Sequence, residues 1–161
     1  MMPKFEIYPV TVDQGQIALS PLPGRFGPLR DDVGVIADWA PALVLTLVEQ
    51  AELDHNGVAD LGDHLQQRGI AWRHVSVPDY QTPDADSDLL IDDAVQEAAL
   101  ILSQGGRVLV HCFGGCGRSG MVALRIMIAV GEAPDPAFNR LRLARPCAVE
   151  TADQLVWAQS I

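Results

Sequence analysis

The chain has 161 residues, of which 48% are hydrophobic and 20% are charged, a composition typical of one globular domain with a full core. Its formal net charge of −10 excludes a broad duplex-binding surface, because neutralising nucleic-acid phosphates requires clustered Lys and Arg. We therefore expect a single domain spanning residues 1–161 that binds no nucleic acid.

The cellular location is predicted from the same features. No apolar run reaches the roughly 18 residues of a membrane span, so we expect no membrane association. The start, "MMPKFEIYPV", lacks the basic-then-apolar order of a secretory signal. Three cysteines are too few for a disulfide framework, which favours a reducing compartment. A cytoplasmic protein is predicted.

Apolar runs and helically spaced apolar residues alternate along the chain. The expected elements, in order, are strands at 5–10 and 16–20, a helix at 31–40, a strand at Ala42–Val48, a helix at 60–69, a strand at Ile70–Val77, a helix at Leu89–Gln104, a strand at Arg107–Val110 and a helix at 119–130. Two helices follow, one with Asp135 as N-cap and Pro136 at its first position, and one opened by Thr151 and Gln154 in capping-box spacing. This alternation predicts an α/β fold, with a central, mostly parallel sheet flanked by helices on both faces.

The stretch "HCFGGCGRSG", residues 111–120, connects a buried strand to an apolar helix. Gly114, Gly115 and Gly117 allow backbone angles denied to other residues, so successive N–H groups can turn inward. Inward amides, a helix N-terminus and the guanidinium of Arg118 all favour a bound anion. The stretch therefore predicts a cradle for a tetrahedral anion.

A thiol in this environment becomes a nucleophile, since such surroundings lower a cysteine pKa from about 8.5 to roughly 3.5–7.5. Arg118 can donate two parallel hydrogen bonds to phosphoryl oxygens. We predict phosphoryl transfer to the sulfur of Cys112, with no metal and no cofactor. A phosphocysteine would form while an acid protonates the leaving oxygen, and the same group would then activate water.

The acid is expected just beyond a parallel strand, where ligands gather at the carboxyl edge of an α/β sheet. Asp79 follows the strand Ile70–Val77 by two residues, as Cys112 follows Val110. Asp79 is therefore predicted to be the general acid and base. Asp84, later in the same loop, is the alternative acid; otherwise it caps the following helix.

The loop, with His111 before the thiol and Ser119 and Gly120 after it, resembles the signature loop of the cysteine-dependent protein tyrosine and dual-specificity phosphatases. Together with "SPLPG", "PDYQTPD" and "AVET", it is most similar to the cyclin-dependent kinase-associated phosphatase branch. The resemblance implies a phosphorylated protein or peptide substrate, carrying phosphotyrosine or phosphoserine/phosphothreonine. It implies Cys112 as nucleophile, Asp79 as acid, Ser119 steadying the leaving sulfur, His111 supporting the thiolate from behind, and a phosphate cradle of Phe113, Gly114, Gly115, Cys116, Gly117 and Arg118.

Two residues depart from the family pattern. Cys116 stands where an aliphatic residue is expected, and is either a small buried filler or a resolving thiol that captures oxidised Cys112. Cys147 is interpreted as ordinary packing. Glu150 stands where this branch has a glutamine; pointing inward it would place a second carboxylate in the site, and otherwise it faces solvent.

Other interpretations stay open at this point. Phe113 and Tyr80 either edge the pocket or pack the loop, and Arg145 either holds an anionic partner or ends a helix. A non-protein phosphoester, a sulfur-transfer or arsenate-type reaction, and an idle phosphate-binding module are the alternative functions. A zinc site of His111, Cys112, Cys116 and Cys147 is disfavoured by the strand-to-helix glycines.

Overall fold

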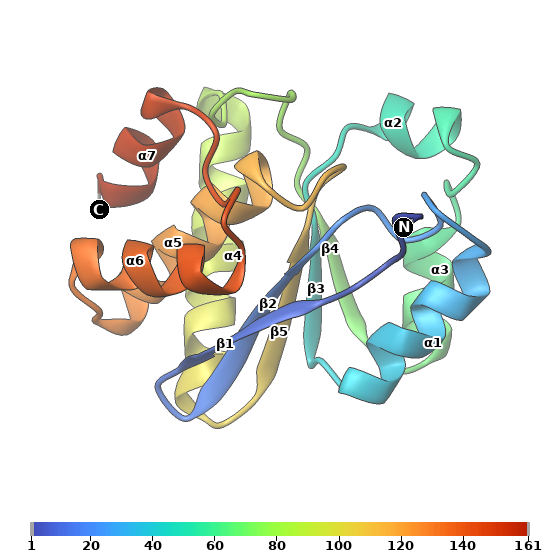
Figure 1. Cartoon of the computed structure of the whole chain (residues 1–161), viewed down its shortest axis with the longest axis horizontal. Helices are drawn as coiled ribbons and strands as arrows, with labels where there is room; N and C mark the ends of the chain where they lie inside the picture. Colours follow the sequence, from blue (N-terminus) through green and yellow to red (C-terminus); the bar gives the residue numbers. More distant parts are fainter. Residues whose placement is uncertain (1, 161) are drawn as a thin grey trace.

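The computed structural model describes residues 2–160, which form one five-stranded sheet and seven helices (Figure 1). In chain order the elements are β1 (Tyr8–Val12), β2 (Gly15–Ser20), α1 (Leu29–Trp39), β3 (Leu43–Thr46), α2 (Gln50–His55), α3 (Leu61–Gln67), β4 (Ala71–His74), α4 (Ala85–Ser103), β5 (Arg107–His111), α5 (Gly117–Val130), α6 (Pro134–Ala144) and α7 (Ala152–Gln159).

The strand order is β1-β2-β5-β3-β4, with β1 and β2 antiparallel and all other neighbours parallel. Helices α1 to α3 cover one face of the sheet, and α4 to α7 cover the other (Figure 1). The predicted α/β fold with a mostly parallel sheet is therefore confirmed. Within residues 2–160, no helix is both long and apolar enough to cross a membrane.

The centre of the sheet positions the signature loop. Strand β5 lies between β2 and β3, and its residues 108–111 are buried. Helix α5, which follows the loop, is buried along residues 117–124. Because β3, β4 and β5 run parallel, their carboxyl ends meet at one edge of the sheet. The loops after these three strands therefore share one site.

Two expected strands are shorter in the structure because their last apolar residues leave the regular ladder while staying buried. The expected strand Ala42–Val48 is β3 (Leu43–Thr46), and Ile70–Val77 is β4 (Ala71–His74). Val77 still donates its N–H to the carbonyl of Leu47 at 2.9 Å. Continuous apolar sequence marks burial, and here burial extends beyond the strand ends.

Two expected helix starts were wrong. Helix α4 begins at Ala85 rather than at Leu89, because Asp84 caps it by accepting the N–H of Ser87 at 2.8 Å. Helix α6 begins at Pro134 with Ala133 as N-cap, so Asp135 lies inside the first turn instead of capping it. The expected capping box of α7, between Thr151 and Gln154, is confirmed.

Candidate active site

The carbonyl groups of the signature loop, defined here as residues 112–118, are hydrogen-bonded to the surrounding protein. The carbonyl of Phe113 accepts from the N–H of Leu22 at 3.0 Å, and that of Cys116 from Gly120 and Val149 at 2.9 and 3.1 Å. The guanidinium of Arg145 donates to the carbonyls of Gly114 at 2.8 Å and Gly115 at 3.1 Å. The carbonyl of Cys112 accepts from the ring of His111 at 3.2 Å.

These bonds determine where the loop amides point. In a planar trans peptide, each N–H points opposite to the preceding carbonyl, so the amides of residues 113–117 face away from the protein scaffold. No hydrogen bond from these amides to the part of the chain that the structure describes is present. The loop therefore offers a row of free N–H donors, as an anion cradle requires.

Gly115 is the glycine on which the loop conformation depends. It has φ +74°, and a Cβ there would lie 2.7 Å from the carbonyl carbon of Ser20. Gly114 and Gly117 have no positive φ, so the expectation that all three glycines supply unusual angles was wrong for these two. A Cβ at Gly117 would overlap a carboxylate oxygen of Glu150, so a larger residue there would require the exposed Glu150 side chain to move.

Cys112 lies at the base of a cavity of about 310 Å³. Its thiol is buried and unbonded to another sulfur, and its Sγ lies 3.2 Å from the Oγ of Ser119. The cavity lining includes Arg25, Asp79, Tyr80, Cys112, Phe113 and Glu150. We call this space the Cys112 cavity.

Arg118 is 1% exposed and held by a carboxylate. Its Nη1 and Nη2 donate to Glu52 at 2.7 and 2.9 Å, and Nη1 also donates to the carbonyl of Val77 at 3.0 Å. Its Nε is buried and has no partner within residues 2–160. Because buried donors are normally paired, this N–H is available to an oxygen of a bound anion.

Both members of this ion pair have shifted pKa values. Burial alone would raise the pKa of Glu52, but the hydrogen bonds from Arg118 and from the Glu49 backbone bring it below its usual value. Burial alone would lower the pKa of Arg118, yet Glu52, Cys112 and Asp79 raise it. The guanidinium therefore stays charged although it is buried.

Glu52 is a site residue that the sequence analysis missed. It belongs to α2, which was not predicted, and its carboxylate also accepts the N–H of Glu49 at 2.7 Å in a capping box. Two signals could have identified it. The segment follows a buried strand at the ligand edge of the sheet, and its two glutamates have capping-box spacing.

His111 is fully buried and neutral at pH 7. Burial is the largest cause of its lowered pKa of about 4. The carbonyl of Cys112 can only accept, so the ring proton of the neutral His111 lies on Nδ1, 3.2 Å from it. Nε2 therefore accepts the hydroxyl hydrogen of Thr46, 2.6 Å away, and the Oγ1 of Thr46 accepts the indole N–H of Trp72 at 2.8 Å. His111 is thus hydrogen-bonded to the backbone of Cys112, and its support of the thiolate stays a prediction.

Asp79 reaches the Cys112 cavity, and Asp84 does not. The Oδ1 of Asp79 accepts the N–H of Tyr80 at 3.0 Å and lies 3.4 Å from Nη2 of Arg118. Asp84 is occupied in capping α4 and is absent from the cavity lining. The geometry therefore favours Asp79 over the alternative acid.

Cys116 and Cys147 form a disulfide, with their sulfurs 2.06 Å apart. Both expectations for Cys116, a filler or a resolving thiol for Cys112, were wrong, and so was the packing role of Cys147. The bond also removes the cysteine count as an argument for a cytoplasmic location, which stays a prediction.

Two of the four suggested zinc ligands are consumed in this bond. Within residues 2–160, no group of three or more His, Cys, Asp or Glu could hold a metal ion.

The remaining candidates lie around the cavity mouth. Glu150 is exposed and also lines the cavity, so its carboxylate is within the site while it remains in contact with solvent. Tyr80 and Phe113 line the same cavity. Arg145 is neither a simple helix end nor distant from the site, because it binds two carbonyls of the signature loop.

Curated proteins resemble this chain in sequence. Cyclin-dependent kinase inhibitor 3 of Mus musculus is 32% identical over 145 residues, covering 86% of this chain and 67% of the relative. The protein of the same name from Rattus norvegicus is 34% identical over 114 residues, covering 69% and 52%. The chain thus spans about half the length of the rat relative.

Solved structures agree in fold. Kinase associated phosphatase, with serine in place of its catalytic site cysteine, superposes with a TM-score of 0.86 at 23% identity, covering 99% of this chain and 95% of that one. Tk-PTP in its active form gives 0.72 at 26% identity, covering 99% and 97%. At 23% identity the first of these likenesses shows the fold alone.

Fold, loop and relatives together define a phosphatase domain of the dual-specificity and protein tyrosine phosphatase superfamily, near the cyclin-dependent kinase inhibitor 3 branch. The model of Tc-R-P, described as a polymorphic toxin system DSP-PTPase phosphatase, matches residues 20–132. The chain belongs to this DSP-PTPase family.

Proposed function

We propose that the chain hydrolyses phosphomonoesters on proteins or peptides through a phosphocysteine intermediate on Cys112. The observation that carries the proposal is that one loop holds, within residues 2–160, the unpaired buried Nε–H of Arg118, a row of unpaired amides and the free thiol of Cys112. Such donors complement the equatorial oxygens of a phosphoryl group in transfer. The charge is stabilised by protein groups, so the cycle requires no metal or cofactor.

In the first step the thiolate of Cys112 attacks phosphorus, forming the S–P bond as the P–O bond to the substrate breaks. Asp79 delivers its proton to the leaving oxygen and becomes a carboxylate. The Oγ of Ser119, 3.2 Å from the sulfur, is placed to hydrogen-bond to Cys112 when it carries negative charge.

In the second step a water molecule attacks the phosphocysteine. Its proton passes to Asp79, its oxygen bonds to phosphorus, and the S–P bond breaks to regenerate the thiolate and release phosphate. Glu150 supplies a second carboxylate in the same cavity and is a candidate to position this water. Glu52 keeps Arg118 oriented through both steps.

The substrate is proposed to be a phosphorylated protein. A relative of this chain is named as a kinase inhibitor, and a structure of similar fold is named as a kinase associated phosphatase; both names point to protein partners of those proteins. The cavity is small and open, and Tyr80 at its edge is 61% exposed. A side chain reaching in from a flexible peptide suits this shape.

A phosphopeptide panel tests this function. Wild-type chain should release phosphate from phosphotyrosine and phosphoserine or phosphothreonine peptides, and Cys112→Ser should bind them without turnover. Inositol phosphates and phosphorylated sugars serve as the non-protein arm. If only inositol phosphates or phosphorylated sugars were hydrolysed, the proposed protein substrate would be refuted, while the proposed phosphocysteine mechanism would stand.

A further inference from the structure

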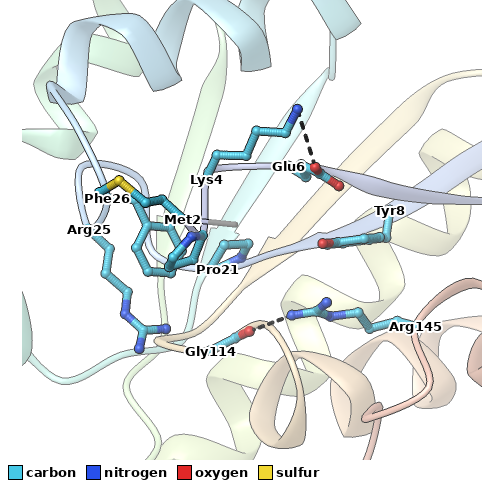
Figure 2. A pocket seen from close by; sticks show the side chains of 10 residues that line it. Met2, Lys4, Glu6, Tyr8, Pro21, Arg25, Phe26, Gly114 and Arg145 are labelled. Carbon is cyan, nitrogen blue, oxygen red and sulfur yellow. Dashed lines mark hydrogen bonds and ion pairs between the residues drawn. The ribbon is translucent and has the colours of Figure 1, made fainter.

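A second pocket, of about 550 Å³, is shown in Figure 2. It adjoins the Cys112 cavity, because the two have lining residues in common. It is formed by the N-terminal segment, the loop after β2 and the segment after α6. We call it the N-terminal pocket; its polar and aromatic lining comprises Lys4, Glu6, Tyr8, Arg25, Phe26 and Arg145. It shares Arg25 and Gly114 with the Cys112 cavity. A peptide segment bound at Cys112 can therefore continue into it.

The N-terminal pocket is positively charged in an acidic chain. Lys4, Arg25 and Arg145 line it against a single carboxylate, Glu6, whereas the whole chain carries −10. Lys4 lies 3.6 Å from Glu6. Among the described residues, no carboxylate oxygen lies within 4.0 Å of either guanidinium, of Arg25 or of Arg145. Two arginines without a carboxylate partner face one pocket.

Both guanidinium groups are held in place by aromatic rings. Arg25 lies 4.0 Å from the ring centre of Phe113 and 4.7 Å from that of Phe26, and Arg145 lies 4.2 Å from that of Tyr8. Figure 2 shows the two guanidinium groups on either side of Gly114. Stacking fixes the guanidinium planes, which reduces the entropy lost when their N–H groups bind an anion.

Each arginine also keeps free donors. Within residues 2–160, Arg25 has one hydrogen bond, from Nη1 to the carbonyl of Phe113 at 3.4 Å. Arg145 uses Nε and Nη2 on the loop carbonyls, which leaves its Nη1 free. Oriented and unpaired guanidinium donors are the features that bind carboxylate or phosphoryl oxygens.

We propose that the N-terminal pocket binds a second anionic group of the substrate, a carboxylate or a second phosphoryl group a few residues from the phosphorylated side chain. The inference rests on the proposed phosphoprotein function and adds a substrate class, acidic or multiply phosphorylated segments. The overall charge of −10 repels such segments, and this pocket provides the local attraction that overcomes the repulsion.

The test compares phosphopeptides of one sequence that differ at a single flanking position. A neutral Gln is replaced by Glu or by phosphoserine, scanned over about four residues on each side, a span of roughly 14 Å each way in an extended chain. We expect kcat/KM to rise about tenfold for the favoured anionic position, as one charge-assisted hydrogen bond would give. Glu and phosphoserine arms distinguish the two kinds of anion.

Substitutions connect this selectivity to the pocket. Arg25→Gln should bring the ratio of kcat/KM for the anionic peptide to kcat/KM for the neutral peptide close to one. Arg25 also lines the Cys112 cavity, but a loss of activity for that reason lowers both values equally and leaves the ratio unchanged. Lys4→Gln should lower the ratio severalfold while turnover of a small aryl phosphate is unchanged. Arg30→Gln is the matched control, since Arg30 is exposed, pairs with Asp31 and lies outside the pocket; it should keep the wild-type ratio.

The outcomes separate the two proposals. Equal turnover of anionic and neutral peptides by wild type overturns the pocket while the phosphoprotein function stands. A preference for anionic peptides that survives both Arg25→Gln and Lys4→Gln also overturns it. If an aryl phosphate is hydrolysed and no phosphopeptide is, the proposed function fails and this inference with it.

Discussion

His111 is buried with both ring nitrogens hydrogen-bonded, and its pKa is lowered to about 4. In the unfolded chain the same ring titrates near its ordinary 6.5. Because the folded state holds it neutral, its contribution to stability is complete above pH 6.5. That contribution is lost as the pH falls from 6.5 towards 4, where the unfolded state binds the extra proton.

Because of His111, we expect the free energy of unfolding of the wild-type chain to fall by about 2 kcal/mol when the pH is lowered from 7 to 5. Urea denaturation at both pH values measures it, with His111→Gln as the comparison. The substituted chain should be less stable at pH 7 but should lose less on acidification. An identical pH dependence in both proteins would show that His111 titrates normally in the folded state.

At the residue scale, the sequence predicted candidate reactive side chains but not the residue that holds Arg118. Cys112, Arg118 and Asp79 could be located because strand ends, glycines and loop spacing mark the ligand edge of the sheet. Glu52 could not, because its partner Arg118 is 66 residues away and ion pairing between distant segments leaves no periodic signal. The structure places Glu52 and Asp79 within 4.0 Å of the Arg118 guanidinium, and Asp79 and Cys112 in the lining of one cavity.

Helix α4 provides the clearest case at the scale of one element. Asp84 was the alternative acid, and the structure shows its carboxylate accepting the N–H of Ser87 as an N-cap. Removing the Asp84 carboxylate should therefore lower the stability of the fold and leave kcat unchanged. Removing the Asp79 carboxylate should instead lower kcat and leave the stability unchanged.

We predict that Asp84→Ala lowers the free energy of unfolding by about 1 kcal/mol with kcat within twofold of wild type. Asp79→Asn should keep stability within about 0.5 kcal/mol and lower kcat by about 10²- to 10⁴-fold. Denaturation and steady-state kinetics on both variants provide the comparison. If Asp84→Ala were the one to lose turnover, the acid assignment would be reversed.

Element boundaries were harder to predict than element types. Helix α4 starts four residues before its apolar pattern does, because its cap and acidic first turn are polar. Helix α2 is only six residues long, too short for an apolar period to identify it. The start of α6 was misplaced because Pro134 and Pro136 are both compatible with a first turn.

At the scale of the whole molecule, two segments fix the signature loop from outside. The loop after β2 binds the carbonyl of Phe113, and residues 145–149 bind the three carbonyls that follow. The Cys116–Cys147 disulfide joins the last of these segments covalently to the loop, across a sequence separation of 31. Spacing alone could not predict this pairing, because it depends on where α6 returns the chain.

Removing the disulfide should destabilise the fold. Closing a loop of this length restricts the unfolded chain by about 3–4 kcal/mol, so Cys116→Ser, Cys147→Ser and the double variant should each lose about that much. Aryl phosphatase activity at 25 °C should fall less than tenfold, since Arg145 and Val149 still hold the loop. Urea denaturation with and without a reducing agent measures the effect. Equal stability of oxidised and reduced wild type would contradict it.

In the proposed mechanism, the phosphoryl group is transferred from the substrate oxygen to the sulfur of Cys112. The most direct measurement is acid-quenched mass spectrometry of Asp79→Asn mixed with p-nitrophenyl phosphate. Its leaving group departs without a proton from an acid, so the first step proceeds while the slowed second step lets the intermediate accumulate. The expected result is one phosphoryl group on the peptide containing Cys112, absent from Cys112→Ser. Product release with unmodified Cys112 at every quench time, or a phosphoryl group on another residue, would contradict the mechanism.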